Sequence, residues 1–410
     1  METFHRSGVP AVHSAGIVVL LLLLLLTGCD QVQGLMQENG DNQPVAPAAG
    51  NPSVPPAAPS QPGSRVPAQT APVDPASVLA NFHELRPHEI TDIELQRLVD
   101  VPEAAAQIQS LDMTGASVGS GAIKLLPQFP NLRTVKLTGV RPPPGNFTGF
   151  SSQATFEEID LDGTTIDDAG IEALATVKTI RRLNLANNSA ISPVGLIPLG
   201  SLGELADLDL SATRVNDQMA PVLARLPLVR LHVTRTAITD QGLVHLAKIK
   251  TLEDLELSFC SQVSGVGFRV FKGAHLKRLG VSQTQFGVEG LAAIRGMRSL
   301  EYLNLYAAGI VEHTRGLVFG SLTGLKTLIM GNNQMTDLGM SRWFKGCKSL
   351  EELKISGHRT ITDQAMQGLI TLKSLRHVDC TGTNVSSRGA AFLKTRIPDV
   401  QVTIGTGERL

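Results

Sequence analysis

A histidine held between two carboxylates is the arrangement in this sequence that could best support acid–base chemistry. Asp209 lies 23 residues before His232 and Glu256 lies 24 residues after it. A general base also needs a nucleophile to activate, and Ser211 and Thr234 are ordinary hydroxyl residues of the same alternating pattern. We therefore expect His232 to be a polar surface residue and not a catalytic base.

Several motifs that would bind metals, phosphates or cofactors are missing. The chain contains no HExxH, no Walker phosphate loop and no CxxC pair, and its 10 histidines are scattered. A formal net charge of −1 also argues against a nucleic acid partner, because phosphate binding needs a concentrated basic patch. We expect no metal, no cofactor and no enzymatic activity.

The beginning of the chain has the features of an export signal. The apolar run AGIVVLLLLLLLTG at 15–28 would span about 21 Å as a helix, too short for a hydrocarbon core of about 30 Å. It ends in Leu26-Thr27-Gly28-Cys29, which resembles the bacterial lipobox. That resemblance implies removal of residues 1–28 and lipidation of Cys29, with palmitate among the acyl chains. The alternative is an ordinary signal peptide with an incidental cysteine.

Residues 29–78 differ in composition from the rest of the chain. Ten of the 23 prolines lie between Pro44 and Pro75, and there is no aromatic residue between Phe4 and Phe82. Such a segment cannot bury enough apolar surface to fold. We expect a disordered tether rich in proline and alanine, with no binding role of its own.

The remainder of the chain repeats every 22–25 residues. Each unit has a short Leu-x-Leu element, and another apolar residue stands three positions before it. The stretch 236–257, TAITDQGLVHLAKIKTLEDLEL, adds a helix whose first turn contains Thr239 and Asp240. The first members of the elements are Leu111, Val135, Ile159, Leu183, Leu208, Leu231, Leu255, Leu279, Leu303, Leu328, Leu353, Val378 and Val400.

A unit of strand, turn and helix cannot bury its own apolar face, so neighbouring units must stack. Residues 85–405 resemble the leucine-rich repeat family, in its helix-bearing, cysteine-containing or ribonuclease-inhibitor-like classes. The resemblance implies an α/β solenoid, right-handed, with a parallel sheet on the concave side and helices on the convex side. We expect 12–13 repeats over 108–410, preceded by a helical cap at 79–107.

In this family an asparagine or cysteine five residues after the first leucine bonds to the backbone of the neighbouring turn. A threonine hydroxyl can serve the same purpose here, whereas Ala308 cannot and His358 is large for the position. Cys260 falls in this series, Cys380 points into the core and Cys347 lies near a helix end, so we expect free thiols. The series is Thr164, Asn188, Thr213, Thr236, Cys260, Thr284, Ala308, Asn333, His358 and Thr383.

Alternation along each strand places three rows of side chains on the concave face. In the first row the charges alternate in sign, either as a structural ladder or also to contact a ligand. The first row is Glu158, Arg182, Asp207, Arg230, Asp254, Arg278 and Tyr302. The second is Asp160, Asn184, Asp209, His232, Glu256, Gly280, Asn304, Ile329, Lys354 and Asp379. The third is Asp162, Ala186, Ser211, Thr234, Ser258, Ser282, Tyr306, Gly331 and Ser356.

Tyr302 and Tyr306 are the only tyrosines in the 410 residues, and both belong to these rows. Their neighbours across the strands are mostly small, which predicts two rings raised above a shallow floor. Tyrosine is enriched in interfaces, but it also favours strands without any ligand. The candidate binding residues are Tyr302, Asn304, Tyr306, Arg278, Glu256, Asp254, His232, Arg230 and Asp209.

Two segments interrupt the pattern of convex helices. The stretch at 140–155 is rich in proline and glycine, and we expect an extended loop there. The stretch at 313–325 lacks the Thr-Asp helix start. Neither interruption changes the spacing of the strands.

These features together predict a lipid-anchored protein of the bacterial cell envelope, facing the periplasm or the exterior. Its concave sheet would bind a protein or peptidic partner without catalysis. The alternatives are a structural envelope protein without a discrete ligand and a hydrolase with an unrecognised site.

Overall fold

The computed structural model describes residues 73–143, 145–271, 273–312, 319–405 and 408–409. The predicted signal peptide, Cys29 with its lipid, and the tether as far as residue 72 lie outside these residues, as do residues 313–318. Residues 69–410 form a compact unit of their own, and the fold below is that of this unit.

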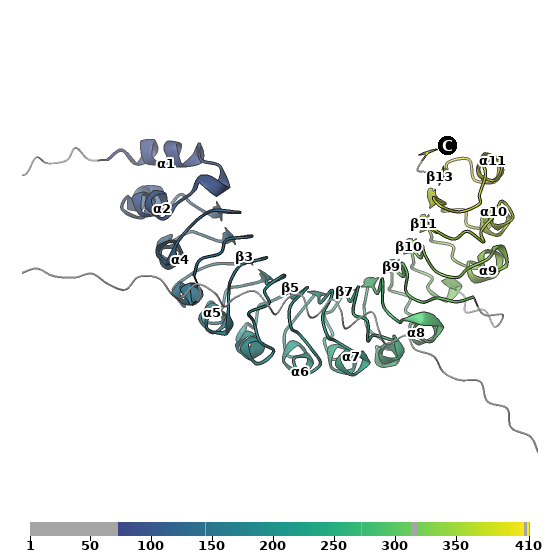
Figure 1. Cartoon of the computed structure of the whole chain (residues 1–410), viewed down its shortest axis with the longest axis horizontal. Coiled ribbons are helices and arrows are strands. Elements are labelled where there is room, and N and C mark those ends of the chain that lie inside the picture. Colours follow the sequence, from purple (N-terminus) through teal and green to yellow (C-terminus); the bar gives the residue numbers. More distant parts are fainter. Residues whose placement is uncertain (1–72, 144, 272, 313–318, 406–407, 410) are drawn as a thin grey trace, which may run out of the picture. The chain divides into compact units, whose positions relative to one another are not determined.

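The strands of this unit form one sheet, in which each strand pairs with the next along the chain. All neighbours are parallel except the last pair. Figure 1 shows an arc with the strands inside and the helices outside, which confirms the predicted solenoid. The strands are β1 Ser110–Asp112, β2 Thr134–Lys136, β3 Glu158–Asp160, β4 Arg182–Asn184, β5 Asp207–Asp209, β6 Arg230–His232, β7 Asp254–Glu256, β8 Arg278–Gly280, β9 Tyr302–Asn304, β10 Thr327–Ile329, β11 Glu352–Lys354, β12 His377–Asp379, β13 Gln401–Ile404 and β14 Glu408–Arg409.

The strand register confirms the predicted repeat for twelve strands, since each predicted first residue is the central residue of its strand. Leu255, for example, pairs with Leu279. The prediction of Val400 for the thirteenth strand is wrong, because Val402 pairs with Val378. Val402 lies 24 residues after Val378, which is the usual repeat length, and helix α11 (Ser387–Arg396) covers the convex side between them.

Short helices cover the convex side. The N-terminal cap is helical, and its first helix begins at Pro75, inside the segment predicted as tether, where Asp74 caps it. None of the described helices is long and apolar enough to cross a membrane. The helices are α1 Pro75–His83, η1 Pro87–Glu89, α2 Asp92–Val99, α3 Pro102–Ala105, α4 Ser120–Leu125, η2 Leu126–Gln128, η3 Asn146–Gly149, α5 Asp168–Leu174, η4 Val194–Ser201, α6 Ala220–Leu223, α7 Asp240–Leu246, η5 Val266–Val270, α8 Gly287–Ala293, η6 Phe319–Ser321, α9 Asp337–Trp343, α10 Ala365–Leu369 and α11.

The aspartate of the Thr-Asp helix start connects consecutive repeats. Asp240 at the start of α7 accepts hydrogen bonds from the backbone N–H and the hydroxyl of Ser264, at 3.0 and 2.6 Å, and from the Gly267 N–H at 3.0 Å. Asp337 accepts the corresponding pair from Thr362. Asp240 therefore also stabilises the packing of one repeat on the next, beyond its place in the first turn of its own helix.

The first interruption is not a fully extended loop, because η3 forms a single 3₁₀ turn within it. Phe147 and Phe150 are buried, and their rings stack 6.3 Å apart. Two aromatic side chains therefore fill the convex layer where the prolines prevent a longer helix.

The predicted ladder is present, but threonine plays a different part in it from asparagine. Asn188 donates to Leu161 O of the preceding turn at 2.8 Å, and Cys260 donates to Val233 O at 3.1 Å. The Thr284 hydroxyl instead donates to Val281 O of its own turn at 2.7 Å, and the Thr164 hydroxyl donates to the Asn188 side chain at 3.0 Å and not to the backbone of a neighbouring turn. The expectation that threonine replaces asparagine between turns is therefore wrong.

The two unusual ladder positions are resolved differently. Asn333 reaches back to Leu305 O at 2.8 Å and so serves the turn in which Ala308 has no polar side chain. His358 is buried, and its Nε2 lies 2.8 Å from Met330 O, so that this nitrogen must donate. Its Nδ1 has no hydrogen-bond partner among the described residues.

The three cysteines of the solenoid are free and buried, as predicted. Burial raises the pKa of the Cys347 thiol to about 12 and that of the Cys380 thiol to about 12. Both stay protonated and act as small apolar side chains in the core.

Candidate binding surface on the concave sheet

The first row is a set of ion pairs and not a continuous ladder. Arg182 lies 2.6 Å from Glu158, and Arg278 lies 3.2 Å from Asp254. Arg230 contacts Asp207 in the same way. No ion pair joins one of these couples to the next within the first row of the described sheet, so alternation gives three separate pairs. All are partly exposed, and each contributes at most about 1 kcal/mol to stability.

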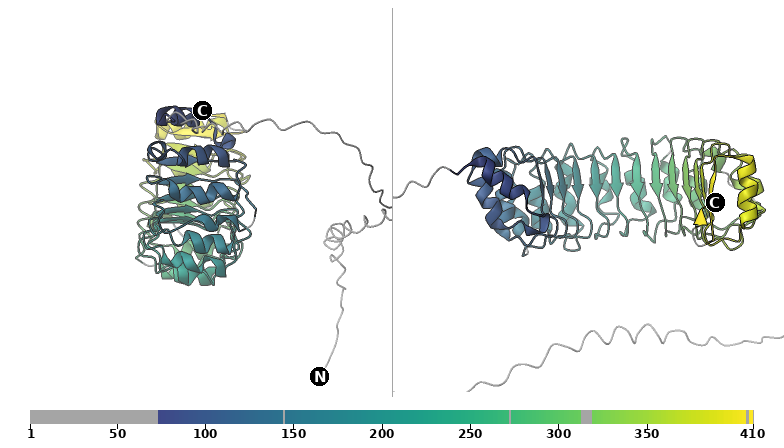
Figure 2. Two further views of the ribbon diagram at one scale, coloured as in Figure 1. Left: turned by 90° about the vertical axis from the view of Figure 1, so that its left-hand side faces the viewer. Right: turned by 90° about the horizontal axis from the view of Figure 1, so that it is seen from above.

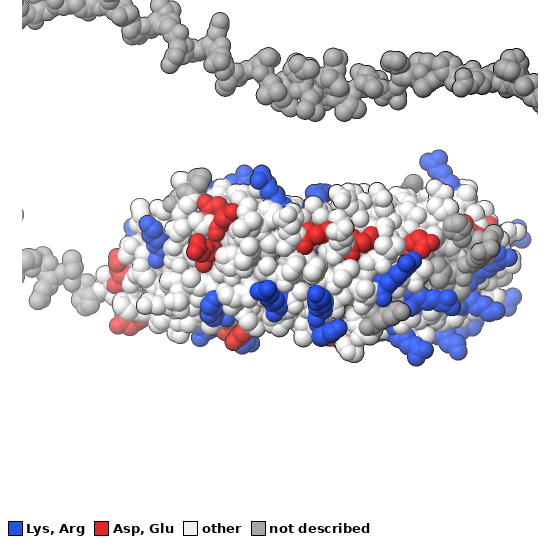
Figure 3. All heavy atoms as spheres, turned by 90° about the horizontal axis from the view of Figure 1, so that it is seen from below, with Lys and Arg blue, Asp and Glu red and all other residues white. Residues whose placement is uncertain are grey.

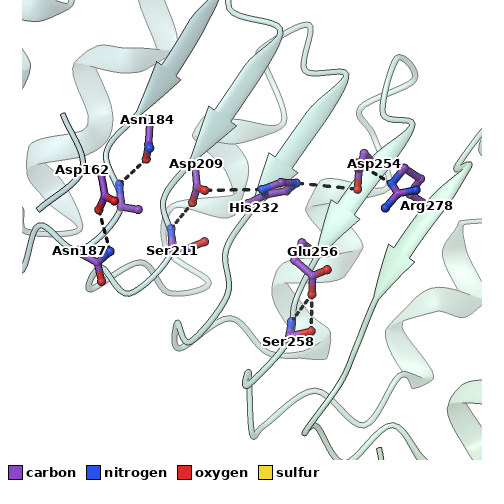
Figure 4. A network of polar contacts seen from close by, with 11 residues as sticks. Asp162, Asn184, Asn187, Asp209, Ser211, His232, Asp254, Glu256, Ser258 and Arg278 are labelled. Carbon is purple, nitrogen blue, oxygen red and sulfur yellow. Dashed lines mark hydrogen bonds and ion pairs between the residues drawn. The ribbon is translucent and has the colours of Figure 1, made fainter. Parts of the chain in front are cut away.

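The second row closes the turns at the strand ends, a role that the sequence reasoning missed. Asp209 accepts the Ser211 N–H at 2.8 Å and Glu256 accepts the Ser258 N–H at 3.0 Å (Figure 4). Asn304 accepts the Tyr306 N–H at 3.1 Å in the same way. A side-chain oxygen that bonds a backbone N–H two residues later is an Asx-type turn. The recurring spacing of an acidic or amide residue two positions before the turn was the available signal.

His232 lies between two carboxylates, as Figure 4 shows, but one of them is not the predicted residue. Its Nδ1 is 3.6 Å from Asp209 and its Nε2 is 4.0 Å from Asp254. Glu256 pairs with His232 in the strand register, yet its side chain bends toward Ser258. The prediction of Asp209 and Glu256 as the flanking pair is therefore half wrong.

The electrostatics of this contact favour a charged pair. The hydrogen bond with Asp209 raises the pKa of His232 against the opposing effect of burial. Burial alone would raise the pKa of the Asp209 carboxyl, but hydrogen bonds with His232 and Ser211 outweigh it and lower that pKa. The ring is therefore protonated over a wider range of pH than a free histidine.

The tyrosines face the concave side as predicted, but their rings are half-buried and not raised. The Arg278 guanidinium lies 4.0 Å from the centre of the Tyr302 ring. The Tyr306 hydroxyl accepts a hydrogen bond from Asn332, and its ring lies so near Gly331 that an added Cβ would come within 3.1 Å of it. Because the neighbouring residues are small, they leave space beside the strand, and the two rings pack into this space close to the sheet.

The predicted residues fall into two groups on this surface. A shallow depression of about 230 Å³ over β3–β6 contains Asp209, Arg230 and His232. Tyr302 and Tyr306 lie on β9 and at its end, outside this depression. Asp254 and Arg278 join the two groups, since Asp254 contacts both His232 and Arg278.

Hydrolytic chemistry gains no support from the described residues. Residues 115–119, GASVG, have the GxSxG spelling of a nucleophile elbow and lie between β1 and α4. Ser117 is exposed, and the nearby Asp92 carboxylate bonds the N–H groups of Gly119 and Ala122. Among the described residues no group of three His, Cys, Asp or Glu side chains is placed to hold a metal ion.

Comparison with known proteins agrees with the geometry. A family model described as Leucine Rich repeat matches residues 152–175. An internalin (inlF) from Listeria monocytogenes is similar in structure, with 17% identity and a TM-score of 0.53, covering 77% of this chain and 94% of that one. A leucine-rich repeat protein of Leptospira interrogans has 14% identity and a TM-score of 0.43 over 74% of this chain and 98% of that one. The fold is a leucine-rich repeat solenoid, and the match supports that family for the chain.

Proposed function

We propose that this protein is a non-enzymatic scaffold that binds a protein or peptide partner on its concave sheet. The observation that carries the proposal is a line of contacts across neighbouring strands. It runs from Asp209 through His232, Asp254 and Arg278 to the ring of Tyr302. These contacts hold charged and aromatic side chains in place before a partner arrives, which lowers the entropic cost of binding.

The residue types in this line suit recognition. Arginine and tyrosine are among the residues most enriched at the centres of protein interfaces. Arg278 is about half exposed while it stacks on Tyr302, so both can contact a partner without moving. The depression around His232 offers an acidic second subsite, suited to a basic side chain of the partner.

A pulldown tests the proposal with matched variants. Residues 69–410 would be immobilised and exposed to solubilised envelope proteins, beside the double variant Tyr302→Ala/Tyr306→Ala. The control is Phe259→Ala, because Arg235 lies 5.1 Å from the Phe259 ring in a similar stacked pair outside the three rows. We expect the double variant to lose partners that the wild type and the control retain.

The outcome also separates the alternatives. If the wild type and the double variant recover the same partners, the tyrosines are not the site. If no variant recovers any partner, a structural role without a discrete ligand gains support; the pairing of the first-row charges within the chain already favours it. Turnover in a hydrolase screen that disappears in His232→Ala would contradict a non-enzymatic function.

We propose further that Cys29 carries a lipid and anchors the solenoid in the bacterial envelope, facing the periplasm or the exterior. The support is the sequence Leu26-Thr27-Gly28-Cys29 after a short apolar run. Incorporation of radiolabelled palmitate into the full chain would test this, and label that persists in Cys29→Ser would refute it. Cys260, which bonds the preceding turn, supports the cysteine-containing class of repeat.

A further inference from the structure

The turns that lead from the convex helices to the next strands are strongly basic in the second half of the solenoid. Between residues 224 and 398, these turns contain Lys and Arg but no Asp or Glu, apart from the residue directly before each strand, which is Glu253, Glu301 or Glu351 in three of them. With the same residue left out, the turns before residue 206 contain one lysine, Lys178, and one acid, Glu204. The basic flank, as we name it, consists of the turn residues Arg225, Lys248, Lys250, Arg295, Arg298, Lys345, Lys348 and Lys373, together with Lys394 and Arg396 in the last turn of α11.

These side chains occupy equivalent places in stacked repeats, and so they lie on one side of the molecule. Arg295 and Lys345 each stand 8 residues before the centre of the next strand, and Arg298 and Lys348 stand 5 residues before it. All members of the flank are exposed except Lys394, which is half-buried. Figure 3 shows Lys and Arg in a band along one long side of the convex face, densest toward the C-terminal end.

The basic flank is not neutralised within the chain. No member forms an ion pair with a described residue; Lys373 donates to Arg396 O at 3.3 Å, and the Arg396 guanidinium lies 5.7 Å from the Phe392 ring. The basic residues that immediately precede strands behave differently. Lys277 lies 2.9 Å from Glu253, and Lys326 lies 2.7 Å from Glu301. Stacked charges of one sign repel each other, so an unpaired row has to be compensated from outside.

Helix dipoles explain only part of this charge. A cation in the last turn of a helix is stabilised by the helix dipole, which fades within one turn. Arg298 and Lys348 stand 5 residues beyond the ends of α8 and α9, outside that range. In the corresponding turns of the first half, Arg133 and Arg181 pair with Glu157 and Glu204, and Lys178 is the one basic residue there without an ion pair among the described residues.

The shape of the flank points to an extended, flat ligand. Figure 2 shows the repeats following one another in a nearly straight row, so that each flank is a flat side of the arc. A peptide would use the curved sheet or a groove, whereas a flat row of separate positive charges matches a planar array of negative ones. We propose that the basic flank binds the surface of an anionic lipid bilayer.

Such binding would set the orientation of the solenoid. With the flank against the bilayer, the concave sheet stands upright and opens sideways along the membrane, free for a partner. Each Lys or Arg close to an anionic surface strengthens binding by about fivefold at most, and salt weakens it. The inference rests on neither the concave site nor the lipid on Cys29.

Sedimentation with lipid vesicles tests the inference on residues 69–410, the compact unit that contains the solenoid. We expect binding to vesicles of phosphatidylcholine mixed with phosphatidylglycerol, and none to phosphatidylcholine alone. The variant Arg295→Gln/Arg298→Gln/Lys345→Gln/Lys348→Gln should lose at least about tenfold in affinity. Circular dichroism would check that it remains folded.

The matched control removes the same formal charge from paired positions. Arg133→Gln/Lys277→Gln/Lys326→Gln/Arg376→Gln also loses four positive charges, and each of its targets has an acidic partner within 3.5 Å. We expect it to keep affinity within about threefold of the wild type. An equal loss in both quadruple variants, or equal binding to neutral vesicles, would overturn the inference.

Two further measurements distinguish membrane binding by the flank from the binding of a protein partner and from the binding of a soluble polyanion. Tyr302→Ala/Tyr306→Ala should bind vesicles like the wild type, even if it loses a protein partner. Polyphosphate chains that bind as tightly as the vesicles, with the same loss in the flank variant, would assign the flank to a soluble polyanion and not to a membrane.

Discussion

The charges of the concave sheet and those of the basic flank both recur once per repeat and stack on their equivalents, but their signs differ. On the sheet the signs alternate, and neighbours such as Glu158 and Arg182 are in contact. On the flank the sign is constant, and residues such as Arg298 and Lys348 have no acidic partner among the described residues. In a repeat protein, the sign pattern of stacked positions separates charges that serve the fold from charges left for a ligand. Substitutions of charged residues should therefore change stability where the charges are paired within the fold, and not on the basic flank.

The largest expected effect concerns the carboxylates that connect repeats. Asp240→Ala removes three hydrogen bonds to Ser264 and Gly267, and we expect it to lower the free energy of unfolding by about 2–3 kcal/mol. Lys248→Ala, on the basic flank two residues beyond the end of the same helix, should change it by less than about 0.5 kcal/mol. Urea titration followed by circular dichroism would measure both, and equal losses would break the comparison.

The second prediction concerns His358, whose Nδ1 is buried without a partner. His358→Asn introduces the residue that makes several hydrogen bonds at Asn188 and Asn333, and should raise stability by about 1 kcal/mol near neutral pH. Burial lowers the pKa of His358. Below about pH 6.5 the unfolded chain therefore takes up a proton that the folded state resists, and stability falls. Thermal melts across that pH range should show a smaller fall of the melting temperature in the variant than in the wild type. An equal fall in both proteins, or a wild type that acid stabilises more than the variant, would contradict the prediction.

An effect of about the same size is expected where the backbone is strained. Every described turn four residues after the central residue of β1–β12 has a positive φ, and the end repeats have glycine there, whereas Ala212 has φ 54°. Ala212→Gly should stabilise the fold by about 1 kcal/mol, because only glycine adopts this conformation without cost. Gly163→Ala is the reciprocal control at φ 63°, with nothing within 4 Å of the new methyl group, and should destabilise by about as much. Guanidinium titrations would show whether the two changes have opposite signs.

The smallest effect should come from the concave histidine, with a pH dependence opposite to that of His358. The hydrogen bond with Asp209 raises the pKa of His232. Its stabilising contribution is therefore complete below about pH 6.5 and is lost as pH rises through the folded-state pKa. His232→Gln should flatten this change in the melting temperature by no more than a few degrees. Titration of the ring by NMR would show directly whether its pKa lies above that of a free histidine.

The periodicity of the chain was sufficient to predict the sheet. Leu255 and Leu279 pair because a spacing of 24 residues returns each unit to the same place on its neighbour. The one error in register, at Val400, departed from this period, since Val402 lies 24 residues after Val378. The same periodicity placed Tyr302 and Tyr306 on the concave face, since side chains alternate along a strand.

The contacts within the candidate site were less predictable. Glu256 stands opposite His232 in the register, yet it turns to Ser258, and Asp254 takes its place. A register fixes the positions of Cβ atoms, whereas rotamers choose among the partners within reach. Gly331 likewise leaves space for the Tyr306 ring close to the sheet, and the spacing of residues in the sequence does not reveal this.

The sequence by itself determined the repeat length, the buried leucines and the three rows of the concave face. These features follow from the repeat period of about 24 residues and the strand period of 2 residues, neither of which depends on side-chain conformation. Only the tertiary structure decided which charges pair, which ladder residues cross between turns, and which basic residues lie unpaired on one flank. Those outcomes depend on distances of a few ångströms between residues that are far apart in the chain and meet only after stacking.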